Sequence, residues 1–227
     1  MKTKHLLPLI VLLAVVLGCS RLGDMAGNDN LAANSANANA AAAPPEGTST
    51  GITPSSDPRA DIDRMAEAFL SQKTFRAKVV GSGQAPMNIQ LEYVAPDRFR
   101  IENSQGPESV IIGRDAYIQI GDRWVKSPQK LDTSTLDIRK TWDEQGRRLI
   151  TDAKFVGEDV INGKPVYVYA YHNKGMDGIG ENDSKLWVGR SDGLPARIEA
   201  TYKSGVLTSV TVDYEYDPSI TIEPPVK

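Results

Sequence analysis

The sequence predicts a mainly β protein with few helices, built as a curved antiparallel half-barrel of about ten or eleven strands. Apolar and polar residues alternate through most of the chain from Phe75 onward, as they do in half-buried strands. Turn signals separate the alternating segments, and Asn162-Gly163 is the strongest of them. Several strands are apolar on both faces, as at Leu186-Trp187-Val188, which indicates that other elements cover the sheet.

One helix is expected to precede the strands. Asp57 can cap this helix, and Pro58 suits its first position, where a missing N–H costs nothing. Apolar residues then recur at helical spacing, at Ile62, Met65, Ala66, Phe69 and Leu70. This stripe requires an apolar surface to cover, and the predicted sheet provides one.

The strands follow in short segments joined by tight turns. Pro96-Asp97 and Gly121-Asp122 are two of these turns, and Asn162-Gly163 favours a type I′ hairpin. The segments that read as strands are residues 75–79, 87–93, 98–102, 109–113, 116–120, 123–126, 166–171, 185–190, 196–202 and 206–216, with a further arm before Asn162.

The strand pattern lapses between Pro128 and Leu149. Within this insertion, apolar residues at Leu131, Leu136, Ile138 and Trp142 indicate a helix or an ordered loop that crosses one face of the sheet. Together with the first helix, the insertion is expected to cover the concave face of the half-barrel. A closed barrel or a two-sheet sandwich would satisfy the same two-sided apolar pattern.

The N-terminus has the pattern of an export signal. Lys2 and Lys4 precede the apolar residues 6–17, a run shorter than the roughly 20 residues that a membrane-spanning helix needs. The stretch Val16-Leu17-Gly18-Cys19 then resembles the lipobox of bacterial lipoproteins. That resemblance implies cleavage before Cys19 and acylation of its thiol. An ordinary secretory signal with an incidental cysteine is the alternative.

Three parts of the chain follow from these patterns. Residues 1–18 are predicted to be a lipoprotein signal peptide, and residues 58–227 to be the folded domain. Residues 19–57 join them as a lipidated cysteine with a tether rich in Ala, Asn, Ser, Gly and Pro, a composition typical of disorder. A flexible tether of this length would span roughly 34 Å root-mean-square.

Charge and cysteine content exclude several classes of protein. The 227 residues include 26 Lys and Arg against 29 Asp and Glu, a net charge of −3. Loss of residues 1–18 removes two lysines and no acids, so the mature chain has 24 basic against 29 acidic residues and a net charge of −5. This mild acidity argues against nucleic acid as a partner and against electrostatic adhesion to anionic membranes. A single cysteine excludes an intramolecular disulfide.

No catalytic residue, metal site or cofactor is predicted. Ser127 and Lys130 form an S-x-x-K string, but the string follows a strand and lacks the helical domain of the penicillin-recognising enzymes. His172 is the only histidine of the mature chain, so zinc sites lack ligands. Carboxylates in residues 177–183 could hold calcium, but they lack EF-hand spacing, and a solvated hairpin loop is the simpler interpretation.

Longer segments resemble a known superfamily. "YVAPDRFRIEN" (residues 93–103) and "VIIGRDAYIQIGDRWVKSP" (110–128), followed by "VINGKPVYVY" (160–169) and "KLWVGRSDGLPARIEATY" (185–202), are similar to the LolA-like superfamily of lipoprotein carriers and lipid-binding lipoproteins. The resemblance implies a half-open antiparallel barrel whose concave face accepts acyl chains beneath a helical lid. Carriers of the family have no anchor, so Cys19 brings this chain closer to membrane-attached relatives.

The resemblance and the strand pattern together give expected site residues. Eight apolar side chains are expected to line a ligand cavity, with ordinary core packing as the alternative: Met87, Ile89, Leu91, Tyr93, Ile118, Ile120, Trp124 and Trp187. Leu136, Ile138 and Trp142 are the lid candidates, or else part of a permanently packed helix.

The predicted function is therefore that of an anchored envelope lipoprotein, which binds acyl chains of a lipid or a lipoprotein for sorting or transport and performs no catalysis. Its expected partners are an acyl lipid or lipoprotein and the membrane, reached through the anchor, with an envelope protein as a further possibility. The domain would face the periplasm or the exterior, and Ser20 after Cys19 resembles an outer-membrane address. An envelope sensor or protein-interaction scaffold with the same fold is the alternative function.

Overall fold

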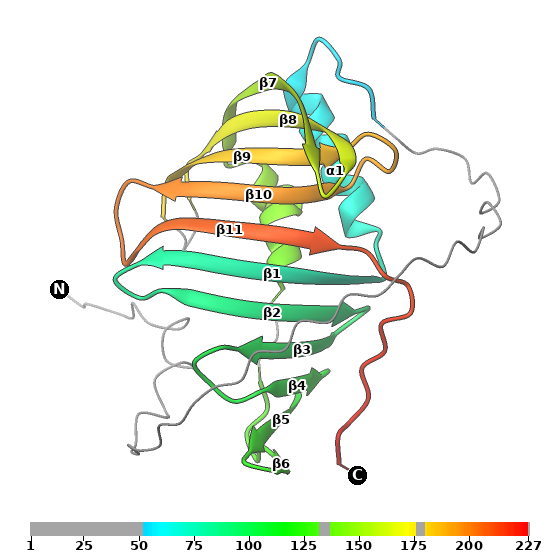
Figure 1. The fold of residues 1–227 in the computed structure, drawn as a ribbon, viewed down its shortest axis with the longest axis vertical. Helices are drawn as coiled ribbons and strands as arrows, with labels where there is room; N and C mark the ends of the chain where they lie inside the picture. The colour runs from blue at the N-terminus through cyan, green and yellow to red at the C-terminus, as the bar shows by residue number, and fades with distance from the viewer. Residues whose placement is uncertain (1–51, 132–136, 176–179, 227) are drawn as a thin grey trace, which may run out of the picture.

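The computed structural model describes residues 52–131, 137–175 and 180–226, which fold around one large sheet (Figure 1). Eleven antiparallel strands make up this sheet, in the order β6-β5-β4-β3-β2-β1-β11-β10-β9-β8-β7. The elements are α1 (Pro58–Leu70), β1 (Thr74–Gly83), β2 (Met87–Val94), β3 (Arg98–Asn103), β4 (Ser109–Ile112), β5 (Asp115–Ile120), β6 (Arg123–Lys126), η2 (Ile138–Trp142), α2 (Glu144–Arg147), β7 (Ile150–Ile161), β8 (Lys164–Asn173), β9 (Asn182–Gly189), β10 (Pro195–Tyr202) and β11 (Leu207–Glu215).

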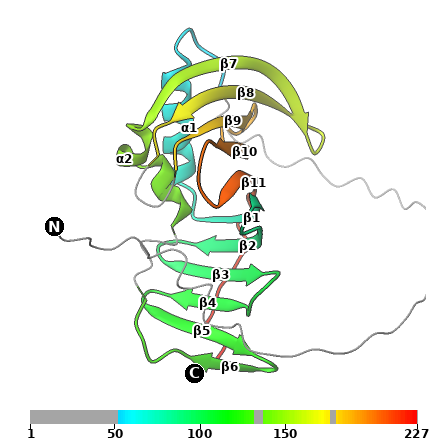
Figure 2. The same ribbon diagram turned by 90° about the vertical axis from the view of Figure 1, so that its left-hand side faces the viewer.

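The sheet consists of two meanders that meet in its middle. Strands β1 to β6 form one meander and β7 to β11 the other, and the first strand pairs with the last, from Arg76 opposite Glu215 to Gly83 opposite Leu207. Edge strands β6 and β7 do not pair with each other, so neither a closed barrel nor a two-sheet sandwich forms. Strands β7 and β8 arch over α1, whereas β2 to β6 form a flatter ladder (Figure 2). The predicted curved half-barrel is confirmed.

Helix α1 forms where the sequence predicts it. The Asp57 carboxylate accepts hydrogen bonds from the backbone N–H groups of Arg59 (3.0 Å) and Ala60 (3.1 Å), and Pro58 occupies the first helical position. The apolar stripe of the helix is buried against the sheet, through Ile62, Met65, Ala66 and Phe69. Figures 1 and 2 show all the helices on the same side of the sheet. We call this side the helix face and the other side the outer face.

The mid-chain insertion also covers the helix face. It includes η2 and α2, and the η2 residue Trp142 is fully buried, with its ring centroid 6.3 Å from that of Tyr171 on β8. This confirms the prediction of a helical or looped insertion across one face. None of the helices described in the structure is both long and apolar enough to cross a membrane.

The outer face has two small apolar clusters, which explain why many strands are apolar on both sides. Near β4 and β5 the C-terminal segment packs Ile220 and Ile222 against Val110 and Tyr117. Arg98 fixes this segment by donating a hydrogen bond from Nη1 to the Ile222 carbonyl (2.6 Å). The second cluster lies on β8 and β9 and contains Val166, Val168 and Trp187.

Candidate functional site

The helix face changes from fully buried to half-exposed along the strands. Beside α1, Phe75, Tyr93 and Phe99 are at most 3% exposed and belong to the main core. Farther along these and the neighbouring strands, most side chains on this face are apolar and half-buried or exposed. We call these residues the apolar strip: Val79, Met87, Ile89, Ile101, Ile118, Val125, Val210 and Val212.

Strand register brings the members of the apolar strip onto neighbouring strands of one face, with Ser109 of β4 between Ile101 and Ile118. Val79 lies opposite Ile89 on one side and Val212 on the other, and Ile118 lies opposite Val125. Side chains two residues apart share a face, so Ile118 follows the buried Ala116 on the helix face. The strip thus extends from β6 to β11, six strand spacings, or roughly 29 Å at about 4.8 Å per strand.

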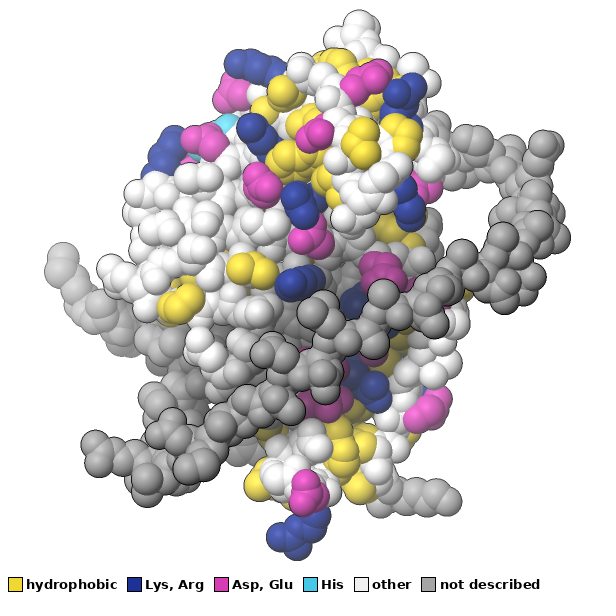
Figure 3. Space-filling view, in the orientation of Figure 1, with side chains coloured by type: hydrophobic (Ala, Val, Ile, Leu, Met, Phe, Trp, Pro, Cys, Tyr) yellow, Lys and Arg dark blue, Asp and Glu magenta, His cyan; other side chains and the backbone are white. Residues whose placement is uncertain are grey.

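The strip is uncharged, in contrast to the outer face of the same strands. There Arg76 Nη2 lies 2.7 Å from Glu92 and Arg76 Nη1 lies 3.0 Å from Glu215, while Arg197 Nε donates a hydrogen bond of 2.6 Å to Asp213. Figure 3 views the outer face, where basic and acidic side chains are interspersed. One sheet therefore presents a hydrocarbon-like surface on one side and a charged surface on the other.

An arginine lies over the core next to the strip. The guanidinium of Arg139, from η2, sits 4.1 Å from the centre of the Tyr93 ring and is hydrogen-bonded to both carboxylate oxygens of Asp137 (2.8 and 2.7 Å). The Tyr93 hydroxyl donates to the carbonyl of Pro96 (3.0 Å). Burial raises the pKa of the Tyr93 phenol, against the opposing effect of the Arg139 charge. These contacts hold η2 in place over the core.

A buried carboxylate fixes α1 to the sheet. Asp61 accepts hydrogen bonds from the Ser55 N–H (2.9 Å), the Ser55 hydroxyl (2.7 Å) and the Tyr169 hydroxyl on β8 (3.1 Å), and it pairs with Arg64. Burial by itself would raise the pKa of Asp61, but these donors outweigh it and hold that pKa below its ordinary value. The covered half of the helix face is therefore held by polar contacts as well as by packing.

The structure brings together most of the predicted ligand-contacting residues. Met87, Ile89 and Ile118 belong to the strip, and Ile120 continues it at the end of β5, where it is 63% exposed. Leu91 and Tyr93 share their face but are buried in the core. These six residues lie on the helix face, as a common surface requires.

Two predicted residues lie elsewhere. Trp124 is opposite Gln119, so it faces the outer side, where it packs against the cluster that contains Ile220. Trp187 also faces outward, and its indole N–H donates a hydrogen bond to Asp159 (3.0 Å). Neither tryptophan contributes to the strip.

The structure describes two of the three lid candidates, Ile138 and Trp142. Ile138 is half-buried against the core, and Trp142 is buried in it. Leu136 lies outside the described residues, as do Cys19 and residues 20–51 of the predicted tether.

Sequence reasoning missed Val79, Ile101, Val125, Val210 and Val212 as members of the site. The alternation in each strand places them on a shared face with core residues. What links them across strands is the register, above all the pairing of β1 with β11, which no local pattern indicates.

The geometry does not support a catalytic role for the S-x-x-K string or a metal site. The Ser127 hydroxyl accepts a hydrogen bond from the Gln129 N–H (3.2 Å), and Lys130 pairs with Asp115. Across the described parts of the chain, no group of three or more His, Cys, Asp or Glu side chains could hold a metal ion. Residues 177–179 of the suggested calcium loop lie outside the described residues.

Comparisons with known proteins identify the fold. No family model and no curated protein matches the sequence. Among solved structures, LprF of Mycobacterium bovis is similar with a TM-score of 0.58 and 12% identity, over 78% of this chain and 100% of that one. The lipoprotein LppX of Mycobacterium tuberculosis is similar with a TM-score of 0.54 and 13% identity, over 73% and 98%.

A LolA superfamily protein of Nitrosomonas europaea also matches, at 12% identity and a TM-score of 0.30 over 71% of this chain and 92% of that one. Likenesses at such low identity concern the fold alone, and the two mycobacterial structures carry the comparison. With its open antiparallel sheet and helices on a single face, this chain has the fold of LprF and LppX, which is the curved half-barrel that its sequence predicts.

Proposed function

We propose that this chain is an anchored envelope lipoprotein that binds the acyl chain of a lipid or lipoprotein on the apolar strip. One observation carries the proposal: away from the helices the helix face stays mostly apolar, interrupted by Asn103 and Ser109, where a purely structural sheet would become polar. The binding requires burial and no bond-making, so no catalytic step is part of this function.

The chemistry of the strip suits an alkyl chain. Its side chains are valine, isoleucine and methionine, and none of them carries a charge or a hydrogen-bonding group. Surfaces of this kind bind by removing apolar area from water. An acyl chain that buried about 300 Å² of apolar surface would gain on the order of 7 kcal/mol, at about 25 cal/mol per Å².

The length of the strip suits the same ligand. A single leaflet contributes half of the roughly 30 Å hydrocarbon core of a bilayer, so one lipid chain extends over about 15 Å. The strip, at roughly 29 Å, exceeds this length, which leaves room for a long chain or for two chains in sequence.

The predicted anchor places this surface near a source of lipid. Acylated Cys19, followed by a tether that ends at Asp57, would keep the domain within reach of a bilayer in the cell envelope. The similar LppX is itself a lipoprotein, which supports this localisation.

The function is tested by the lipid that the full chain retains on purification. Native mass spectrometry, paired with analysis of extracted lipids, should find near-stoichiometric acyl lipid on the protein. Val79→Asn with Ile89→Asn places two amides opposite each other in the strip. Because an amide against an acyl chain costs about 1–3 kcal/mol, the pair should reduce lipid retention by about tenfold or more.

Val80→Asn is the matched control, since it lies next to Val79 on β1 but on the outer face, where it is 38% exposed. It should retain lipid like the unmodified chain. A protein that carries no lipid, or a loss of lipid that is equal in both variants, would exclude the strip as an acyl-binding surface. A lipid-free chain that captures an envelope protein would favour the scaffold function instead.

A further inference from the structure

The free edge of the sheet at β7 exposes large apolar side chains. Phe155, Val156 and Val160 are 39%, 56% and 61% exposed. All three lie in the second half of β7, which leads to the Asn162-Gly163 turn. In Figure 3, hydrophobic side chains gather at this end of the outer face. We call residues 155–161 the apolar edge.

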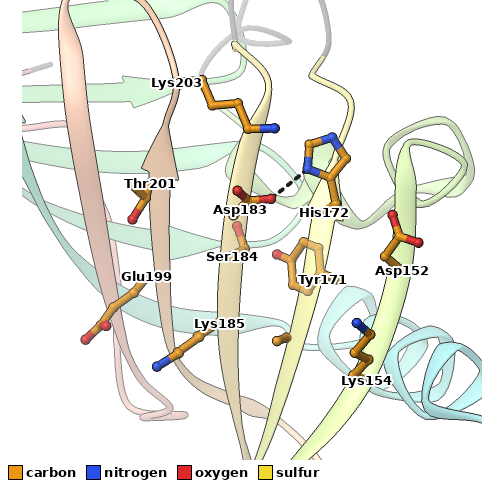
Figure 4. A pocket seen from close by; sticks show the side chains of 11 residues that line it. Asp152, Lys154, Tyr171, His172, Asp183, Ser184, Lys185, Glu199, Thr201 and Lys203 are labelled. Carbon is orange, nitrogen blue, oxygen red and sulfur yellow. Dashed lines mark hydrogen bonds and ion pairs between the residues drawn. The ribbon is translucent and has the colours of Figure 1, made fainter.

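The first half of β7 is different, because it borders a charged hollow. This hollow is a shallow depression of about 700 Å³ on the outer face (Figure 4). The carboxylates and lysines in its lining balance each other: Asp152, Asp183 and Glu199 against Lys154, Lys185 and Lys203. The apolar edge therefore begins where this charged surface ends.

The acidic side chains of the apolar edge are turned back onto the sheet. Glu158 Oε2 lies 3.1 Å from Nη1 of Arg190, which follows β9 directly. Asp159 accepts a hydrogen bond from the indole N–H of Trp187 on β9 (3.0 Å). Because β9 is two strands in from β7, these contacts draw both carboxylates away from the free edge. The side chains that remain at the edge are apolar.

The apolar edge is apolar on both faces of the sheet. Phe155 faces the helix side, where its ring centroid lies 5.5 Å from that of the buried Tyr169. Ile161 packs against the outer-face cluster on β8 and β9, so Val160 next to it faces the helix side. A rigid protein surface could cover only one of these faces, whereas fluid hydrocarbon can surround both.

A second strand is poorly suited to this edge. Two β-bulges interrupt β7, between Thr151 and Lys154 and between Phe155 and Gly157. Bulges at a sheet edge bend the strand and disrupt the regular row of backbone groups with which another strand would pair. The geometry therefore favours lipid over a second copy of this chain.

We propose that the apolar edge contacts a bilayer, with Val156 and Val160 at the boundary between the headgroups and the acyl chains. Lys154 and Lys164 are exposed on either side of the edge. Their ammonium groups can stay among the headgroups while their stems lie against the apolar region. The contact is driven by apolar burial, so it requires no anionic lipid, in keeping with the acidity of the chain.

The end of the predicted tether is fixed near this edge. Ser55 donates hydrogen bonds to Asp61 from its N–H and its hydroxyl, and Asp61 accepts another from Tyr169 on β8. Since β8 is the strand next to β7, the tether joins the domain at the same end of the sheet as the apolar edge. The apolar strip begins at β11, four strand spacings or roughly 19 Å from β7, so the inference does not depend on acyl binding there.

Methyl resonances of the full chain in phosphatidylcholine nanodiscs test the contact. A trace of lipid with a gadolinium chelate on its headgroup should broaden the signals of Val156 and Val160 strongly and that of Val206 little. Val206 is the matched reference, since it is 44% exposed in the turn between β10 and β11, away from β7. Val156→Asp with Val160→Asp should reduce the broadening of the neighbouring Ile161 severalfold, because charged side chains avoid the acyl region.

Val80→Asp with Val206→Asp is the control, since it adds the same charges at valines that are 38% and 44% exposed elsewhere. It should leave the broadening of Ile161 unchanged. Equal losses in the two double variants would overturn the proposal, as would equal broadening, or none, at Val160 and Val206.

Two other outcomes would also overturn the proposal and show what takes its place. Val160 signals that shift with protein concentration in the absence of nanodiscs would assign the edge to a second copy of the chain. Broadening at Val79 without broadening at Val160 would mean that the strip holds lipid while the edge does not touch the bilayer. That result would leave the proposed function standing.

Discussion

The two ends of the helix face are built from the same strands but from different side chains. At the covered end, aromatic rings form a chain in which Phe69 lies 5.2 Å from Phe75, Phe75 lies 5.1 Å from Tyr93, and Tyr93 lies 5.3 Å from Phe99. At the open end the strip contains only aliphatic side chains. Aromatic pairs stabilise a permanent core, whereas the aliphatic side chains of the strip leave apolar area in contact with water that a ligand can cover.

This difference separates stability from binding along each strand. Residues under α1 and η2 should determine whether the protein folds, and residues of the strip should determine what it holds. Substitutions that are chemically identical but placed at the two ends should therefore have different effects.

The largest effect is expected at the helix side of the aromatic chain. Phe69 is fully buried and contacts Phe75, Tyr214 and Tyr216. Phe69→Ala removes these contacts and leaves a cavity, so the free energy of unfolding should fall by about 3–5 kcal/mol. Urea denaturation followed by circular dichroism measures this loss. A loss below about 1 kcal/mol would mean that α1 does not close the core.

A matched pair of isoleucines compares the two ends directly. Ile111 on β4 is 2% exposed in the core, and Ile118 on β5 is half-buried in the strip. Ile111→Ala should lower the free energy of unfolding by about 2–5 kcal/mol, and Ile118→Ala by about 1 kcal/mol. Equal losses in denaturation experiments would contradict the division of the face into a core and a strip.

A smaller loss is expected at the carboxylate that fixes α1. Asp61→Asn weakens a buried, hydrogen-bonded ion pair and should cost about 1–3 kcal/mol at neutral pH. Asp63→Asn is the control, since its pair with Arg59 is partly exposed and should contribute less than about 1 kcal/mol.

The stabilisation from Asp61 should also depend on pH. The pKa of this group is lower in the folded protein than its ordinary value, so the unfolded chain binds more protons in acid. The stabilisation is fully present above the ordinary carboxyl pKa of about 3.9 and is lost as the pH falls from there toward the lower folded-state value. Denaturation midpoints of Asp61→Asn should fall less steeply with acid than those of the unmodified chain.

The smallest effect is expected on the outer face. Glu92→Gln removes the carboxylate that lies 2.7 Å from Arg76, a pair in which neither partner is fully buried. The expected loss is about 0.2–1 kcal/mol, and added salt should reduce it further. Thermal denaturation at low and high salt measures the difference, and a loss comparable to that of Phe69→Ala would contradict the account.

Much of the fold could be predicted from local patterns. Asp57 and Pro58 mark the start of α1, and Asn162-Gly163 forms the expected hairpin, with positive φ at both residues (51° and 76°). Strand pairing at the centre of the sheet could not be predicted, because β1 and β11 are more than a hundred residues apart and no turn sets their register.

The candidate site could also be predicted only in part, because local alternation assigns residues to a face within each strand but does not set the register between distant strands. Alternation correctly groups Met87 with Ile89, and Ile118 with Ile120. Trp124 could have been assigned to the outer face, since the two-residue Gly121-Asp122 turn places it opposite Gln119. Trp187 could not, because apolar residues on both of its sides make the two faces of β9 indistinguishable in the sequence.

Contact between an acyl chain and the strip is the central claim, and a spin-labelled fatty acid tests it most directly. With the methyl groups of the isoleucines and valines isotopically labelled, the bound label should broaden the signals of Val79, Ile89 and Ile118. Those of Ile62, beneath α1, and of Val80, on the outer face, should be broadened less. Equal broadening at Val80 and Val79, or no broadening at either residue, would contradict the claim.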